Sequence, residues 1–200
     1  RLASGGSLRL AAQSRVVLTG ADAAELLAGR LYFDSESARA GAPFTVTTDL
    51  GNVRDIGTQF LARLDPAAGR FDVGVRDGRV EVMRGNETGA AGVGERLVIT
   101  QDAASIRRDT IATFGGEWDW VERVAPPFDT DGRTIGDFLT WFAAQTGRTV
   151  EFGSTDAERA ARERISGPID FPLLQQLSAV LAIADLTYAL EGELVVINTR

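Results

Sequence analysis

Apolar and polar residues alternate through the first half of the chain, over residues 8–100. Short runs rich in β-branched and aromatic residues, such as Phe44–Thr47, recur about every 10–15 residues with Gly, Asn, Asp or Ser between them. A period of two is typical of strands with one buried face. The pattern predicts an all-β domain over residues 1–115, with one short helix at Ala21–Ala28, and it contains no fixed-length repeat.

The clearest local signal in this half is the pair Asp77-Gly78. Apolar residues alternate with polar ones before it, in Phe71–Val75, and after it, in Val80–Val82. An Asp-Gly pair between two alternating runs favours a hairpin turn in which glycine supplies a positive φ. We predict that Gly78 completes such a turn, and that Gly57 serves a second turn. Both glycines are expected to hold backbone geometry and to contact no ligand.

The period-two pattern lapses over residues 115–131, where Gly115-Gly116, Pro126-Pro127 and two tryptophans occur. Such a Gly- and Pro-bearing stretch is typical of a domain boundary. We predict a linker over residues 116–130. Trp118 and Trp120 are more simply explained as pinning this linker to a domain face than as binding a ligand.

A helical period begins at Thr134. Ile135, Phe138, Leu139 and Phe142 share one face, with Thr134 as N-cap and Gly147 just past the C-terminus. A second helix is expected after Asp170 as cap and Pro172 in the first turn, and its apolar face would comprise Leu173, Leu174, Leu177, Val180, Leu181 and Ala184.

Short apolar runs around these helices predict strands. They are Arg148–Phe152, Ile165–Ile169, Leu186–Leu190 and Leu194–Ile197, with an optional opening strand at Pro127–Thr130 and a solvated helical turn at Asp156–Glu163. The resulting order, α-β-β-α-β-β, defines a small α+β domain over residues 131–200.

Three residue types are missing from the chain, and their absence excludes several kinds of chemistry. There is no Cys, no His and no Lys, and all 21 basic residues are Arg. Thiolate metal sites, His-based catalysis, Walker A loops and Schiff-base chemistry are therefore excluded. We expect no catalytic residue, no cofactor and no bound metal, and hence not an enzyme. A net charge of −7 argues against a nucleic-acid partner.

Two weak motifs do not change this view. Asp129–Gly132 resembles the start of a calcium loop, but Arg133 and Thr140 stand where further acids are needed. Gly89–Gly94 is rich in glycine, but it leads into a strand, whereas a phosphate cradle needs a helix N-terminus. No apolar stretch is long enough to span a bilayer.

Several segments of the first half resemble the FecR family, in the family's order. They are Gly6–Leu10, Leu27–Phe33, Pro43–Thr48, Gly51–Phe60, Val75–Val82 and Gly94–Leu97. The residues that match its motifs, which we expect to be structural, are Pro43, Phe44, Gly51, Gly57, Thr58, Phe60 and Gly78. The resemblance implies a solenoid-like β fold, with a sandwich as the other arrangement that an all-β chain allows.

The second half is similar to the short STN domain of secretins and TonB-dependent transducers. The similarity rests on Phe138–Gly147, Gly167, Leu177–Leu181, Leu186–Tyr188 and Val195–Ile197. Most of these positions are apolar, so the resemblance is carried by spacing more than by chemistry.

Together the two resemblances imply a regulator of cell-surface signalling in a Gram-negative bacterium. Such a protein is an anti-sigma factor of the inner membrane. Its periplasmic part receives a signal from the N-terminal signalling domain of an outer-membrane TonB-dependent transducer, in iron or siderophore uptake. The sigma factor is contacted by a cytoplasmic segment, and the membrane is crossed by a single span; the present chain would be the periplasmic part alone. A periplasmic carbohydrate- or polymer-binding β protein is the alternative.

The partner is expected to bind the C-terminal domain. If the strand formed by Leu194, Val195, Val196 and Ile197 is an edge, its unpaired backbone groups can accept a further strand. The competing interpretation is that this strand is central and buried on both sides, and the sequence leaves both open.

Overall fold

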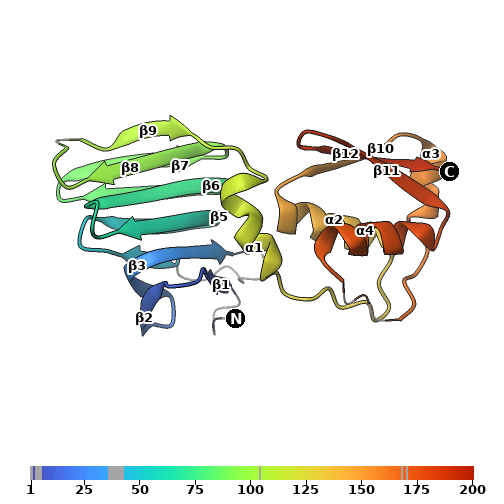
Figure 1. Cartoon of the computed structure of the whole chain (residues 1–200), viewed down its shortest axis with the longest axis horizontal. Helices are drawn as coiled ribbons and strands as arrows, with labels where there is room; N and C mark the ends of the chain where they lie inside the picture. The colour runs from blue at the N-terminus through green and yellow to red at the C-terminus, as the bar shows by residue number, and fades with distance from the viewer. Residues whose placement is uncertain (1, 3–5, 36–42, 104, 168, 170) are drawn as a thin grey trace. The chain divides into compact units, whose positions relative to one another are not determined.

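The structure is a computed structural model that describes residues 2, 6–35, 43–103, 105–167, 169 and 171–200. The chain divides into two compact units, Arg1–Thr113 and Phe114–Arg200. The first unit is almost entirely β, and the second combines helices with a small sheet (Figure 1). The chain is thus mainly β with a small α+β part, as the pattern predicts.

The first unit is one nine-stranded mixed sheet. Its strands are β1 (Ser7–Leu10), β2 (Arg15–Gly20), β3 (Ala23–Asp34), β4 (Thr45–Thr47), β5 (Asn52–Asp65), β6 (Arg70–Arg84), β7 (Glu87–Gly92), β8 (Glu95–Thr100) and β9 (Arg107–Thr110). The order β1-β3-β4-β5-β6-β8-β9 forms the main path, with β2 on β3 and β7 on β6. All pairs are antiparallel except β3 with β4, and no solenoid is detected among the described strands.

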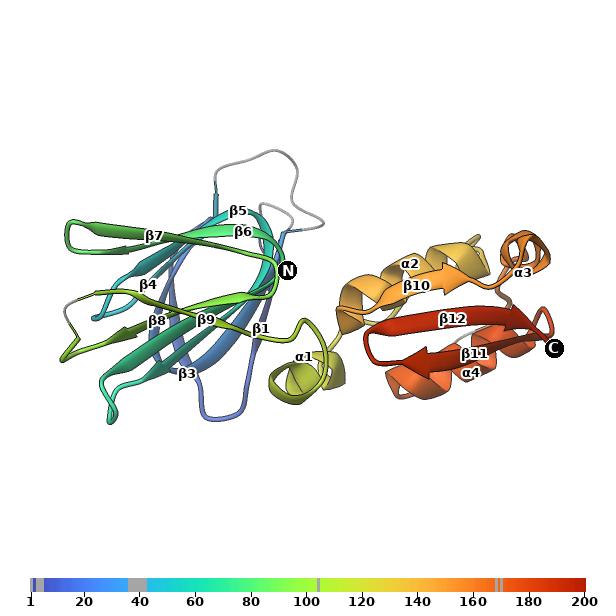
Figure 2. The same cartoon turned by 90° about the horizontal axis from the view of Figure 1, so that it is seen from above.

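The long strands β3, β5 and β6 each serve two parts of the sheet. The first half of β3 pairs with β2 and β4, and its second half pairs with β1. Similarly, β6 pairs with β8 through residues 70–74 and with β7 through residues 79–84. The sheet is therefore curled, as Figure 2 shows, and residues of both parts bury their side chains in a single apolar core.

Each long strand changes the face on which its core residues lie. In β5 the core residue before the change is Val53, and those after it are Phe60, Ala62 and Leu64. The core positions thus have odd numbers before the change and even numbers after it. In β6 the change runs from Phe71–Val75 to Val80 and Val82. Because side chains alternate along a strand, such a change requires an inserted residue. A β-bulge must therefore interrupt each strand.

The bulge between β5 and β6 is built by the two glycines that the sequence singled out. Gly57 and Thr58 lie opposite Gly78, between the pairs Ile56–Arg79 and Gln59–Asp77, which inserts a residue in β5. Arg76 is the residue inserted in β6, between the pairs Gln59–Asp77 and Phe60–Val75. Gly57 and Gly78 have φ of 67° and 73°. The predicted hairpin at Asp77-Gly78 is wrong, because β6 continues through it as one strand. The turn predicted at Gly57 is wrong for the same reason, because β5 continues through Gly57. The change of pattern on either side marks a bulge. The backbone role predicted for Gly78 remains, since a Cβ there would lie 2.0 Å from the Gly57 carbonyl oxygen.

Strand β3 bends in the same manner at Gly29, whose φ is 90°. A Cβ at Gly29 would lie 2.6 Å from the Cα of Ser14, whose hydroxyl bonds the backbone of Arg30. The helix predicted at Ala21–Ala28 is wrong, since most of this segment lies in β3. Its residues favour a helix locally, but Ala24 and Leu26 alternate into the core, and tertiary packing overrides weak propensity.

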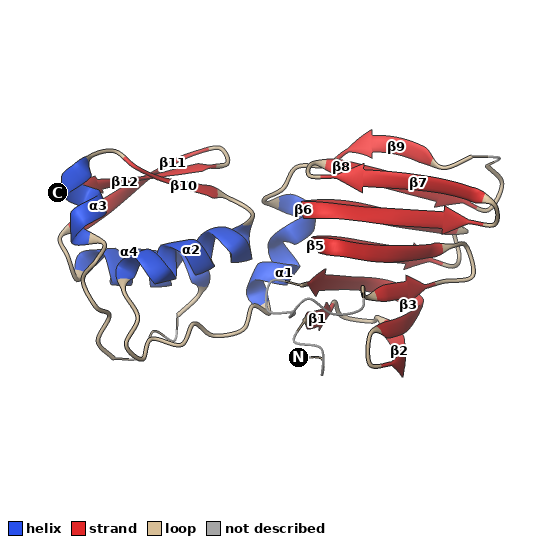
Figure 3. Cartoon of the chain, turned by 180° about the vertical axis from the view of Figure 1, so that it is seen from behind, coloured by secondary structure: helices blue, strands red, loops and turns tan. Residues whose placement is uncertain are grey.

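The described residues of the second unit form a 3₁₀ turn, four helices and a three-stranded sheet. These elements are η1 (Gly116–Trp118), α1 (Asp119–Arg123), α2 (Ile135–Thr146), β10 (Thr149–Phe152), α3 (Thr155–Ala160), α4 (Leu173–Ala182), β11 (Leu186–Glu191) and β12 (Leu194–Thr199). Helices α2 and α4 lie along one face of the sheet (Figure 3). Their apolar stripes pack with Val195 and Ile197 into a second core.

Local signals define the ends of α2 well. The Thr134 hydroxyl accepts a hydrogen bond from the Asp137 N–H, and the Asp137 carboxylate accepts one from the Thr134 N–H. This reciprocal capping box starts the helix, and Gly147 ends it with a φ of 65°. The second predicted helix also forms, as α4, whereas the predicted cap Asp170 lies outside the described residues.

Three other predictions for this part differ from the structure. The segment 116–130, expected to be a linker, contains η1 and α1. The described residues of Ile165–Ile169 form no strand, and the neighbouring Arg164 makes only an isolated bridge to Thr134. Pro127–Thr130 is likewise not a strand. Apolar runs this short fit loops that pack on a core as well as they fit strands.

We expect Gly78→Ala to lower the free energy of unfolding by at least about 3 kcal/mol, because the new Cβ overlaps the Gly57 carbonyl. Gly85→Ala is the matched control. Gly85 also has a positive φ, of 56°, but no atom lies within 4 Å of the position that its Cβ would take, so its cost is about 1 kcal/mol. Denaturant unfolding measures both. Equal losses would contradict the close approach at the bulge.

Candidate partner-binding surface

The strand proposed from sequence as a partner edge is central. Strand β12, which contains Leu194–Ile197, lies between β10 and β11 in the order β10-β12-β11. It is parallel to β10 and antiparallel to β11, so its backbone groups are paired on both sides. Val195 and Ile197 are fully buried in the second core. The edge assignment of these four residues is therefore wrong, and strand addition at β12 is excluded.

The edges of this sheet are β10 and β11, each of which pairs only with β12 within the described part of the chain. The end of β11 is open to solvent at Ala189, Leu190 and Glu191. Helix α4 packs under this strand, and the Tyr188 hydroxyl lies 3.3 Å from the Ser178 hydroxyl. The β11 edge and the exposed side of α4 thus form one surface.

Two hollows lie along this side of α4. One, of about 490 Å³, is lined by Phe171, Leu174, Gln175, Ser178, Ala179 and Tyr188. The other, of about 830 Å³, extends from Phe171, Leu174 and Gln176 to Trp141 and Pro127, with Asp119, Glu122 and Arg123 at its rim. Phe171 and Leu174 belong to both hollows and are 51% and 48% exposed. We call the two hollows together the α4 groove.

The α4 groove was not predicted from the sequence. The apolar pattern placed Leu174 on the core face of the helix, whereas Leu173 and Leu177 hold that face and Leu174 points to solvent. Residues three or four positions apart share one face of a helix. Two adjacent leucines therefore cannot both lie at the centre of the buried face. The extra leucine, with Phe171 just before the helix, was the available signal.

The net charge of the chain lies in the second unit. Residues 114–200 hold seven Arg and fourteen acidic residues, whereas residues 1–113 hold fourteen of each. The first unit is therefore neutral, and the second carries the whole charge of −7. Such an asymmetry favours a partner with a basic surface at the second unit.

The motif residues of the first unit hold the fold. Phe44 and Phe60 are buried, and the Phe44 ring stacks on Phe33 with centroids 4.3 Å apart. A Cβ at Gly51 would lie 2.7 Å from the Met83 carbonyl oxygen. The Thr58 hydroxyl donates to the Arg79 carbonyl and accepts from the Ile56 N–H, which closes the bulge. Pro43 is half-buried just before Phe44. None of these residues lines the α4 groove.

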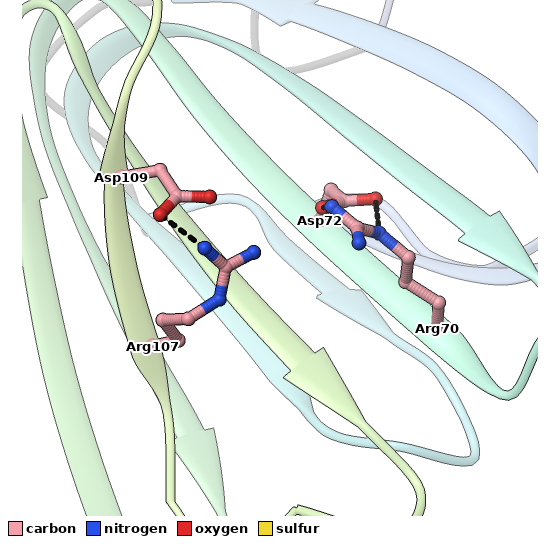
Figure 4. Close-up of polar contacts among 4 residues, drawn as sticks. All are labelled: Arg70, Asp72, Arg107 and Asp109. Carbon is pink, nitrogen blue, oxygen red and sulfur yellow. Dashed lines mark hydrogen bonds and ion pairs between the residues drawn. The ribbon is translucent and has the colours of Figure 1, made fainter.

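Two ion pairs of the first unit each join residues of a single strand. Arg70 donates to Asp72 through Nε and one terminal nitrogen, and Arg107 lies 2.5 Å from Asp109 (Figure 4). Each pair is separated by two positions, so both members lie on the same face of a strand. The Arg107–Asp109 pair lies at the solvated surface, whereas the Arg70–Asp72 pair joins a half-exposed Arg70 to a buried Asp72, and in both pairs each charge is matched by its neighbour.

The first unit also buries a polar cluster beside the bulge. Arg9 and Asp34 are 3.9 Å apart, and the Arg9 guanidinium lies over the Tyr32 ring. Burial raises the pKa of the Tyr32 phenol and lowers the pKa of Arg9. A phenol shifted in this direction stays protonated at neutral pH and cannot act as a general base.

Asp55 is a buried carboxyl next to the bulge. Burial raises its pKa, against the effect of hydrogen bonds from Thr58 and Gly57, and the nearby Asp34 raises it further. Its Oδ1 atom is sealed from solvent and has no partner among the described residues. Ionisation of Asp55 therefore lowers the stability of the folded state relative to the unfolded chain.

The described residues hold neither a metal-binding cluster nor a membrane-spanning helix. No group of three or more acidic side chains in this part of the chain is arranged to hold a metal ion. No helix in the same part is long and apolar enough to cross a membrane.

The N-terminal part of the chain matches a known protein family. Residues 1–81 match the model of the family described as FecR protein, which covers β1–β5 and most of β6. Residues 1–81 are thus similar to a FecR domain, and they include all seven motif residues together with the three strand bends. The match ends before the second unit begins.

Solved structures of similar proteins exist. Two crystal structures of a "putative anti-sigma factor" from Parabacteroides distasonis are similar to the chain, with TM-scores of 0.49 and 0.48. Each is 18% identical in sequence, and the alignment covers 100% of this chain and 92% of that chain. No curated protein sequence matches the chain.

We expect Asp55→Asn to raise the free energy of unfolding near pH 7. Because the folded-state pKa is raised, the stabilising effect of this carboxyl is present at low pH and is lost as the pH rises through the folded-state pKa. The gain from Asp55→Asn should therefore shrink as the pH falls towards about 4, the pKa of an unperturbed Asp. Denaturant unfolding between pH 4 and 8 measures it.

The exposed Asp77→Asn, next to the same bulge, is the control and should change stability little at any pH. If Asp55→Asn instead lowers stability by the same amount at every pH, burial does not disfavour the ionised form of Asp55, and the prediction is wrong.

Proposed function

We propose that the chain is the periplasmic signalling part of a FecR-like regulator of a sigma factor. In this proposal the FecR domain is a rigid β support, and the second unit receives the signal. The signal comes from the N-terminal signalling domain of an outer-membrane TonB-dependent transducer, of the kind that reports siderophore uptake. The sigma factor is reached through a cytoplasmic segment beyond a membrane span. The protein acts by binding and not by catalysis.

The observation that carries this proposal is the FecR match over residues 1–81. The sequence resemblance of the second unit to STN domains supports it, since two domains of one type can meet through their small sheets. The arrangement of α2 and α4 under a three-stranded sheet is compatible with a domain of this kind.

Electrostatics favours the second unit as the receiving part. The first unit is neutral and holds ion pairs both within and between its strands, whereas the second has an excess of seven acidic residues. Long-range attraction between this unit and a basic partner would accelerate their encounter. We therefore place partner recognition on residues 114–200.

The test is a binding titration between the full chain and the signalling domain of a TonB-dependent transducer encoded beside its gene. Glu191→Arg with Glu193→Arg reverses two exposed charges on the second unit. Asp49→Arg with Asp102→Arg makes the same change in total charge on the first unit, also at exposed positions. We expect the first pair to slow association by about tenfold at low salt and the second pair to change it far less.

Equal effects of the two pairs would remove the second unit as the receiving part. Absence of binding by the unaltered chain to every neighbouring signalling domain would contradict the proposed function itself.

A further inference from the structure

We propose that the α4 groove binds an extended, basic peptide segment of a protein partner, with an apolar side chain seated on Phe171 and Leu174. This inference deepens the proposed function and rests on it for the identity of the protein that supplies the segment. The groove itself is defined by residues of the second unit alone.

The shape of the groove favours an extended occupant. Its two hollows, of about 830 and 490 Å³, lie on either side of the shared residues Phe171 and Leu174. Either hollow alone is large enough for a small molecule, but a compact ligand would fill one and leave the other open. A peptide in extended form places successive side chains about 6–7 Å apart on one face and can enter both.

The walls favour an apolar side chain in the middle of that peptide. Phe171 and Leu174 each leave about half of their surface in water. Burial of large apolar side chains is favourable, so a ligand that covers these two residues is stabilised by them. Trp141 and Pro127 continue this apolar wall on one side, and Ala179 continues it on the other. A leucine-sized side chain held between them would be removed from water on several sides.

An unpaired acceptor in the wall favours a donor on the ligand. Gln176 is only 8% exposed, and its amide nitrogen donates to the Phe171 carbonyl oxygen at 2.5 Å. This bond fixes the orientation of the amide, since a flipped amide would place two oxygens together. The Oε1 atom is left buried, with no hydrogen-bond partner among the described residues. A buried acceptor without a donor costs about 1–3 kcal/mol. Oε1 is closed to solvent in the free protein, so a peptide N–H reaches it, and removes that cost, once side chains of the groove wall change rotamer, as is common on binding.

Charge favours a basic segment. Asp119 and Glu122 stand at the rim beside Arg123, and the unit that holds the groove carries the entire negative charge of the chain. The Arg or Lys side chains of an extended segment would point out of the groove where its apolar side chains point in, because successive side chains alternate. Alternating basic and apolar residues are therefore the pattern that fits.

The test uses the full chain and a synthetic heptapeptide, blocked at both ends, that alternates arginine with leucine. Titration should give saturable one-to-one binding. Two control peptides replace arginine by glutamate or leucine by serine, and each should bind at least tenfold more weakly. Two further peptides carry N-methyl groups at alternate backbone nitrogens, one peptide in each register, and one of the two should lose affinity because it cannot donate to Gln176.

The protein-side variant is Leu174→Asp, with Leu18→Asp as its matched control. Both leucines are exposed, at 48% and 58%, so neither change disrupts a core, and thermal unfolding checks this. Leu174→Asp should lower the affinity for the arginine–leucine peptide at least tenfold, and Leu18→Asp should leave this affinity unchanged. Equal binding by the two variants, or equal binding of the glutamate peptide, would overturn the proposal.

The same two variants titrated with the transducer signalling domain separate the two proposals. If that domain binds both variants equally and the peptide does not bind, the groove proposal fails and the proposed function stands. If the peptide binds as expected but no signalling domain does, the proposed function fails and the groove remains a basic-peptide site.

Discussion

The backbone geometry of three glycines determines how the first unit can fold. Gly29, Gly57 and Gly78 each adopt a positive φ in the middle of a long strand, where the strand changes the face that it buries. At Gly78 the neighbouring backbone comes so close that a Cβ cannot be accommodated. Without these bends the two parts of the sheet could not share one core, because half of the apolar side chains would face water.

The sequence contains this constraint, but in a form that misleads local reasoning. An Asp-Gly pair between two alternating runs predicts a hairpin. At Asp77-Gly78 the apolar residues have odd numbers before the pair and even numbers after it, as they could in two separate strands. The pairing of Gly57 and Thr58 with Gly78 is a contact between strands, which no local window contains. For this reason most strands of the first unit were predicted correctly, whereas β7 and β9 were not predicted, and the hairpin and the Ala21–Ala28 helix were wrong.

The second unit was easier to predict in its elements than in its surface. Helix α2 follows from its capping box and apolar stripe, and α4, β10, β11 and β12 follow from short apolar runs. The order of strands in the sheet does not follow from such runs, so the sequence left open whether β12 is an edge or a central strand, and in the structure it is central. The α4 groove depends on which of two adjacent leucines the helix buries, and on a buried amide whose partner only the fold reveals.

These features assign different tasks to the two units. The first unit is neutral and tightly constrained, whereas the second unit carries the net charge and the α4 groove. Hydrogen–deuterium exchange of the full chain, with and without the transducer signalling domain, tests this division most directly. We predict that binding slows exchange in α4 and β11 and leaves the bends of β3, β5 and β6 unchanged. Protection confined to the first unit would contradict this division.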